Sequence, residues 1–136
     1  MTMTVEWMRG CATALVTPFK ADGAIDLPRM RALVERQIAG GVKLLVPCGT
    51  TGERATMNDA EGREVIAATI EVAKGRARVV AGAGSNNTAH AIHQAKEARA
   101  LGADAVLIVA PYYNKPTQDG MLAHFRAVAE AVAPLP

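Results

Sequence analysis

The stretch LLVPCGTTGE, residues 44–53, joins a short apolar run to a loop of glycines, hydroxyls and one carboxylate. The apolar run, Leu44 to Pro47, is continuous and does not alternate with polar residues. Such a run is typical of a strand buried on both faces, as in a parallel sheet. The loop follows the end of that strand, where parallel α/β folds bind their ligands.

Similar apolar runs lie on both sides of this stretch, and helical patterns separate them. The other runs are Cys11 to Val16, Val79 to Ala83 and Ala105 to Ala110. Strands that alternate with amphipathic helices predict a parallel sheet with right-handed crossovers. Apolar residues recur at helical spacing over Leu27 to Ile38, Val65 to Ala73, about Thr88 to Gly102, and Met121 to Val132.

Capping residues mark the ends of these helices. Asp26 is suited to cap the first helix, and Asn58 with Glu61 three residues later forms a capping-box pattern for the second. Glycines at 40–41 and at 75 suit the two helix ends. The chain therefore divides into four strand–helix units of roughly 30 residues each.

Two architectures fit four such units. One is a small doubly wound sheet, and the other is the first half of a TIM (β/α)8 barrel, which needs about 250 residues. The units have similar length and phase, which favours the barrel. We therefore expect residues 1–136 to form the N-terminal half of one barrel domain, with Pro134 to Pro136 leading into a fifth strand.

Composition narrows the function classes. Half of the 136 residues are hydrophobic and the net charge is +2, with basic and acidic residues mixed, so a globular domain without a nucleic-acid partner is expected. No apolar stretch approaches the ~18 residues of a membrane span, so no membrane association is expected. Cys11 and Cys48 lie in apolar runs. We expect both to be buried, reduced thiols, which favours a cytoplasmic location.

Small polar or phenolic groups follow all four apolar runs. Because the carboxyl ends of parallel strands share one edge, we expect these loops to converge on a single pocket. The glycines of residues 49–53 leave backbone N–H groups accessible, and Thr50 and Thr51 add hydroxyls, so a carboxylate or phosphate is the natural guest. A turn stabilised by Ser/Thr side chains is the alternative.

The two tyrosines of the chain, Tyr112 and Tyr113, are adjacent. A phenol can relay protons within a chain of hydroxyls, and an aromatic pair at an interface is the alternative. His90 and His93 stand three residues apart, but no third ligand is evident and no metal is expected. His124 is expected to be a helix-surface or packing residue. No dinucleotide fingerprint is present, so no cofactor is expected.

The loop segments strongly resemble the dihydrodipicolinate synthase family. The wider superfamily contains N-acetylneuraminate lyase and related pyruvate aldolases, but residues 85–88 and 112–116 favour the synthase. The resemblance covers nearly the whole chain from Gly10 onward. The matching segments are Ala14 to Phe19, Gly49 to Glu53, Ala81 to Thr88, Pro111 to Pro116, Gly120, and His124 with Phe125.

The resemblance implies a mechanism in which pyruvate forms a Schiff base with a lysine and the enamine attacks aspartate semialdehyde. By analogy, Thr50 is the central hydroxyl of a proton relay, and Thr51 with the loop backbone holds the pyruvate carboxylate. Tyr113 completes the relay by reaching into the neighbouring subunit, and Tyr112 lies at the dimer interface. The full-length parent would be a homodimer or homotetramer. There are two alternatives: another pyruvate aldolase of the superfamily, or a small non-catalytic anion-binding module.

Two features depart from the family pattern. The Schiff-base lysine, a second relay tyrosine and an arginine would fall after Pro136, so the chain is expected to be inactive alone. Lysine-inhibited relatives carry histidine or glutamate at a position that is Gly62 here, and glutamate at the position of His90. We therefore expect a full-length parent to be insensitive to lysine.

Overall fold

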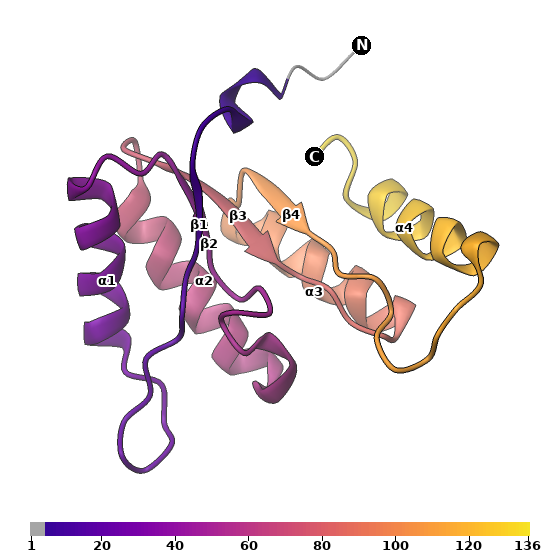
Figure 1. The fold of residues 1–136 in the computed structure, drawn as a ribbon, viewed down its shortest axis with the longest axis horizontal. Helices are drawn as coiled ribbons and strands as arrows, with labels where there is room; N and C mark the ends of the chain where they lie inside the picture. The colour runs from indigo at the N-terminus through magenta and orange to yellow at the C-terminus, as the bar shows by residue number, and fades with distance from the viewer. Residues whose placement is uncertain (1–4) are drawn as a thin grey trace.

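The computed structural model describes residues 5–136, in which four parallel strands alternate with four α-helices (Figure 1). Two short 3-10 helices, η1 and η2, precede β1 and follow β2. The bounds are η1 (Glu6–Met8), β1 (Ala12–Ala14), α1 (Leu27–Ala39), β2 (Leu44–Val46), η2 (Arg54–Thr56), α2 (Asp59–Ala73), β3 (Arg78–Gly82), α3 (Thr88–Leu101), β4 (Ala105–Leu107) and α4 (Gln118–Val132).

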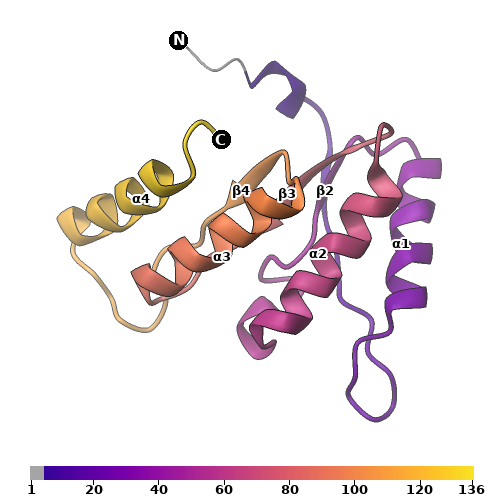
Figure 2. The same ribbon diagram turned by 180° about the vertical axis from the view of Figure 1, so that it is seen from behind.

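The strands follow one another across the sheet in the order β1-β2-β3-β4, and every neighbouring pair is parallel. The strands stand in front of α2 and α3 in Figure 1 and behind them in Figure 2, so these helices cover one face. A doubly wound sheet would reverse its strand order and carry helices on both faces. The expected half of a (β/α)8 barrel is therefore confirmed, and the doubly wound alternative is excluded.

The core lies between the sheet and its helices. One cluster joins Leu15, just after β1, and the strands β2 and β3 to α1, α2 and Ala98 of α3, and a smaller one joins α3 to α4. Burial of each large aliphatic side chain contributes about 1.5–3 kcal/mol, so these clusters hold the helices in place. The largest buried aliphatic side chains of the first cluster are Leu15, Met30, Val34, Leu45, Val65 and Val79, and Val128 and Val132 belong to the second.

The other face of the sheet is bare at its edge strands. Leu15 and Val106 pack on the helix side, so Val16 and Leu107 point to the opposite face, where both are exposed. Burial on both strand faces, expected from the continuous apolar runs, therefore does not hold at β1 and β4. The same positions point into the packed interior of a complete barrel. Beside β4, the carbonyl of Pro136 accepts a hydrogen bond from Val106 N at 3.0 Å, where a fifth strand of a barrel would lie.

The capping predictions are confirmed. Asp26 accepts a hydrogen bond from Arg29 N at 3.0 Å, and Asn58 and Glu61 form both bonds of the capping box. The fourth helix begins at Gln118, where the Thr117 hydroxyl accepts a hydrogen bond from Gly120 N and caps it. The cap residues thus determine the residue at which each of these loops ends and the following helix begins.

The two cysteines differ in exposure. Cys48 is buried as predicted, but Cys11 is exposed, so the prediction of a buried thiol there is wrong. Cys11 immediately precedes β1, which forms an unpaired edge of the sheet, and nothing in the described chain covers it. No helix within residues 5–136 is both long enough and apolar enough to cross a bilayer.

Candidate functional site

A hollow of about 460 Å³ opens at the carboxyl ends of β2, β3 and β4. It brings together the loops that follow these three strands, whereas the loop after the first apolar run, which the sequence predicts to join them, contributes none of the lining residues. Its walls are polar on the side of the residue 49–53 loop and apolar on the side of β4. The lining residues are Cys48, Gly49, Thr50, Glu53, Arg54, Ala55, Thr56, Gly82, Gly84, Leu107, Val109 and Tyr112.

The loop at residues 49–53 is a compact turn. Gly52 N donates to Gly49 O and Glu53 N donates to Thr50 O, each at 3.0 Å. The buried hydroxyl of Thr17, at the end of the first apolar run, donates to Gly52 O at 2.7 Å and fixes the turn from below. A Cβ at position 52 would lie 2.9 Å from Leu15 O, so only glycine fits there without movement. The turn is therefore held against the segment that follows β1.

The same turn leaves the hydrogen-bond donors of two threonines free, and one of the two lies at the hollow. The N–H groups and hydroxyls of Thr50 and Thr51 donate to no described residue, and both side chains are exposed. Thr50 lines the hollow, whereas Thr51 lies just outside its lining. Free N–H groups on a tight turn attract a carboxylate or phosphate. The turn at residues 49–53 is therefore a candidate anion cradle, with Thr50 at the hollow, and its guest stays a prediction.

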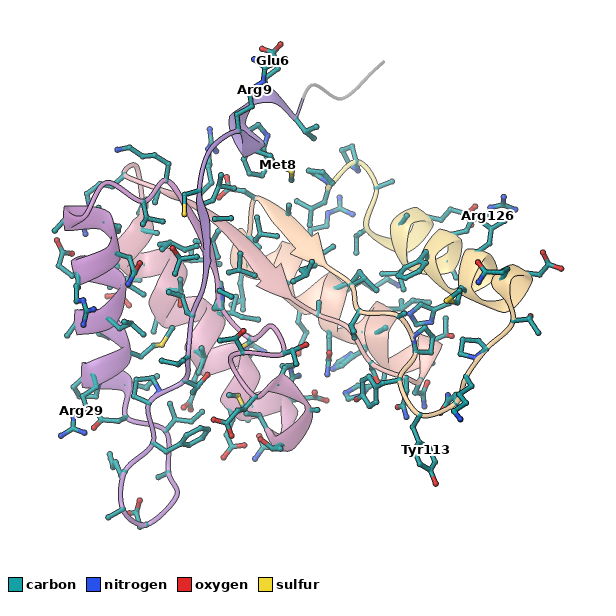
Figure 3. The ribbon with its side chains drawn as sticks, in the orientation of Figure 1. Glu6, Met8, Arg9, Arg29, Tyr113 and Arg126 are labelled. Carbon is teal, nitrogen blue, oxygen red and sulfur yellow. The ribbon has the colours of Figure 1, made fainter. Side chains whose placement is uncertain are left out.

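The two adjacent tyrosines point in different directions. Tyr112 lines the hollow and is 42% exposed. Tyr113 is 94% exposed and projects away from the rest of the chain, as Figure 3 shows. The backbone separates them because Tyr113 has a φ of 68°, in the left-handed region. Only Tyr112 therefore faces the cradle within this chain.

Arg54 is a feature of the site that the sequence reasoning missed. Its side chain is folded back and buried, with the whole residue only 8% exposed. Nη1 donates to the carbonyls of Met57 and Asn58 at 3.1 and 3.3 Å, and Nη2 donates to Asp59 Oδ1 at 2.9 Å. A glycine eight residues later, Gly62, was the available signal, because it leaves room for the guanidinium.

Asp59 connects this arginine to α3. His90 Nε2 lies 2.9 and 3.1 Å from the two carboxylate oxygens, and Gln94 Nε2 donates to Oδ1 at 3.2 Å. The hydrogen bond from His90, with those from Arg54 and Gln94, lowers the pKa of Asp59 to about 2 although desolvation opposes the shift. Asp59 is therefore a charged link between α2 and α3.

Neither the histidines nor the buried cysteine offers a second chemistry. His90 and His93 stack with ring centroids 6.4 Å apart, but residues 5–136 contain no group of three or more His, Cys, Asp or Glu side chains that could hold a metal. Burial raises the pKa of the Cys48 thiol to about 11, so it stays protonated at neutral pH. His124 is a buried packing residue, in line with one of its two expected roles, and its Nδ1 lies 2.9 Å from Thr88 Oγ1.

Comparisons with known proteins agree on one family. The model of the dihydrodipicolinate synthetase family matches residues 7–136. A 4-hydroxy-tetrahydrodipicolinate synthase of Koribacter versatilis is 60% identical over 126 residues, which cover 92% of this chain and 42% of the relative. The chain thus spans about two fifths of that relative's length.

Solved structures show the same likeness. One is a dihydrodipicolinate synthase of Acinetobacter baumannii, described as chloride-inhibited and complexed with pyruvate. It is 48% identical with a TM-score of 0.86, and the match covers 88% of this chain and 41% of the solved chain. A synthase of Cyanidioschyzon merolae with lysine bound is 44% identical with a TM-score of 0.89, covering 92% and 43%. The half-barrel that carries the strand-end hollow is therefore a fold that this chain shares with these solved structures.

Proposed function

Because this chain belongs to the dihydrodipicolinate synthetase family, we propose that it supplies the pyruvate-holding half of a 4-hydroxy-tetrahydrodipicolinate synthase. This lyase condenses pyruvate with aspartate semialdehyde through a lysine Schiff base, in lysine and diaminopimelate biosynthesis. Residues 1–136 form the N-terminal half of its single barrel domain, in a cytoplasmic enzyme. The observation that carries the proposal is that the N–H and hydroxyl groups of Thr50 and Thr51 donate to no described residue, and that Thr50 lines the hollow.

Thr50 and Thr51 hold the carboxylate of pyruvate. Their backbone N–H groups bind the anion, and the fixed turn means that little reorganisation is needed on binding. The Thr50 hydroxyl faces the hollow. It passes protons to and from the oxygen and nitrogen atoms bonded to the reacting carbon of pyruvate. The Acinetobacter baumannii relative complexed with pyruvate supports this substrate.

The amine that forms the Schiff base comes from outside residues 1–136. Five lysines occur in the chain, Lys20, Lys43, Lys74, Lys96 and Lys115, and none of them lines the hollow. Lys115, in the loop beside the tyrosines, is exposed. Without the nucleophile the covalent step does not occur, so the chain alone is inactive.

A second subunit completes the site. Tyr113 buries almost none of its ring in its own chain, which suits a residue that extends the proton relay into a neighbouring subunit. Tyr112 is also partly exposed beside it and lies at the same interface. The assembled enzyme is a homodimer or homotetramer.

A chimeric enzyme tests the proposal. Residues 7–136 replace the matching segment of the Koribacter versatilis relative, and condensation of pyruvate with aspartate semialdehyde is measured. Thr50→Val, which removes the hydroxyl at similar volume, should lower kcat on the order of 10²–10⁴-fold, while Thr50→Ser should retain most of it. A chimera whose Thr50→Val variant keeps full activity would contradict the role of Thr50.

The chain by itself provides the second arm. Borohydride reduction in the presence of pyruvate should leave no stoichiometric adduct on residues 1–136, whereas the chimera should carry one adduct on a lysine of its Koribacter segment. Mass spectrometry of the digested proteins locates the label. Stoichiometric labelling of one of the five lysines of this chain would overturn the proposal that the amine comes from elsewhere.

A further inference from the structure

Tyr113 sits at the centre of a strained three-residue turn. Asn114 N donates to Tyr112 O at 2.8 Å, which closes the turn, and Tyr113 at its centre has a φ of 68°. Three-residue turns with positive φ at the central residue are the rare and strained form. Such a backbone persists in a residue other than glycine only where surrounding contacts enforce it.

Two side-chain hydrogen bonds hold this turn against the loop that follows β3. Asn114 Nδ2 donates to the main-chain carbonyl of Asn86 at 2.8 Å, and Asn86 Nδ2 donates to Asn114 Oδ1 at 3.3 Å. Further along the chain from each of these two loops there is another contact. Thr88 Oγ1 and His124 Nδ1 lie 2.9 Å apart, and His124 is only 4% exposed. The turn is therefore fixed through Asn114 to the loop that precedes α3, and the Thr88–His124 contact holds α3 to α4 beside it.

The direction of the Tyr113 ring depends on this backbone. The ring is 94% exposed and projects from the turn away from the chain (Figure 3), so packing of the ring does not set its position. We propose that Asn114 is a positioning residue, whose carboxamide holds the strained turn and thereby aims the phenol of Tyr113 outward. The value of this aim for catalysis rests on the proposed function, in which Tyr113 acts in a neighbouring subunit.

The two hydrogen bonds are unequal, which makes the inference specific. The shorter bond runs from Asn114 to a main-chain oxygen and does not require the side chain at position 86. The longer bond requires the Asn86 amide. Asn114→Asp keeps the shape of the side chain but has no donor, and its charge would face the Asn86 carbonyl. Loss of order should therefore be large in Asn114→Asp and Asn114→Ala and small in Asn86→Ala.

Backbone ¹⁵N relaxation of the full chain measures the effect directly. The order parameters of the Tyr113 and Asn114 amides should be near ~0.85 in the unaltered chain and fall below ~0.6 in Asn114→Asp and Asn114→Ala. Gln118→Ala is the matched control, because Gln118 is an exposed residue in the first turn of α4 without a side-chain hydrogen bond to any described residue. Unchanged order parameters in both Asn114 variants would overturn the inference.

The chimeric enzyme separates this inference from the proposed function. If Tyr113 is a relay residue, Asn114→Asp should lower kcat about tenfold or more without changing the KM for pyruvate. Adding it to Tyr113→Phe should cause no further loss, since both act through the same phenol. Full activity of Tyr113→Phe, together with lost order in Asn114→Asp, would reject the relay and leave the positioning role intact. An additional loss in the double variant would instead contradict the positioning role.

Discussion

The guanidinium of Arg54 lies directly over Gly62, so close that a Cβ built at position 62 would come within 2.7 Å of Arg54 Cζ. The first turn of α2 therefore has no side chain at position 62, and the Arg54 side chain fills the space there. From there Arg54 bonds to Asp59, which in turn bonds to His90 on α3. Arg54, which lines the hollow, is thus connected through Asp59 to the contact between α2 and α3.

Gly62→Ala should destabilise the chain, because the new methyl group displaces a buried guanidinium and breaks its bond to Asp59. We expect a loss of about 1–3 kcal/mol in the free energy of unfolding, measured by urea denaturation. Gly40→Ala is the control, since a Cβ there meets nothing nearer than 3.4 Å and its φ is −75°. Equal stability of the two variants would contradict the steric argument.

Lysine should not bind to the chimeric enzyme. The two positions at which the family resemblance places lysine-sensing side chains are here Gly62, covered by Arg54, and His90, bound to Asp59. We therefore expect neither inhibition nor a shift in the midpoint of thermal unfolding at about 10 mM lysine, since a bound ligand would raise it. Tight inhibition by lysine would reject this prediction.

Gly82→Ala should be more damaging than Gly62→Ala. A Cβ at position 82 would lie 1.9 Å from Cys48 O, which is main chain and cannot rotate away. The residue 49–53 loop would have to move, so a loss of about 3 kcal/mol or more is expected, with weaker pyruvate binding in the chimera. Urea denaturation and the KM for pyruvate report the two effects. A stable variant with an unchanged KM would show that the close approach is unimportant.

The charge of Asp59 should make stability depend on pH in the acid range. Its folded pKa of about 2 lies below the ordinary 3.8, so its contribution is present above pH 4 and is lost as the pH falls toward 2. Because the side chain is 40% exposed, we expect about 1 kcal/mol or less. The stability difference between the wild type and Asp59→Asn should shrink from pH 5 to pH 2. Glu130→Gln, without an ion pair to any described residue, should show no such trend.

The two thiols should react at very different rates. Cys11 is exposed, whereas Cys48 is 1% exposed and burial raises its pKa to about 11. Iodoacetamide at about pH 8 should therefore alkylate Cys11 first and reach Cys48 only when the chain unfolds. Peptide mass spectrometry distinguishes the sites, and Cys11→Ser leaves Cys48 as the single reporter. Equal labelling of both thiols in the native chain would refute the buried placement.

The sequence by itself determined the repeating architecture and the location of the candidate site. Helical and strand periodicities are local, as are the caps at Asp26 and Asn58, so the four units could be predicted from neighbouring residues alone. That Thr50 would face a strand-end hollow followed from the parallel sheet, because every loop after a strand opens on the same edge. The family resemblance added roles but not positions.

Only the tertiary structure decided which side chains meet at that edge. Tyr112 and Tyr113 are adjacent and chemically identical, and the left-handed backbone held by Asn114 sends one toward the hollow and the other into solvent. Arg54 reads as a surface residue, yet it is buried because Gly62 vacates the space beside it. Such outcomes depend on contacts between distant segments and on strained dihedral angles, and neither leaves a periodic trace in the chain.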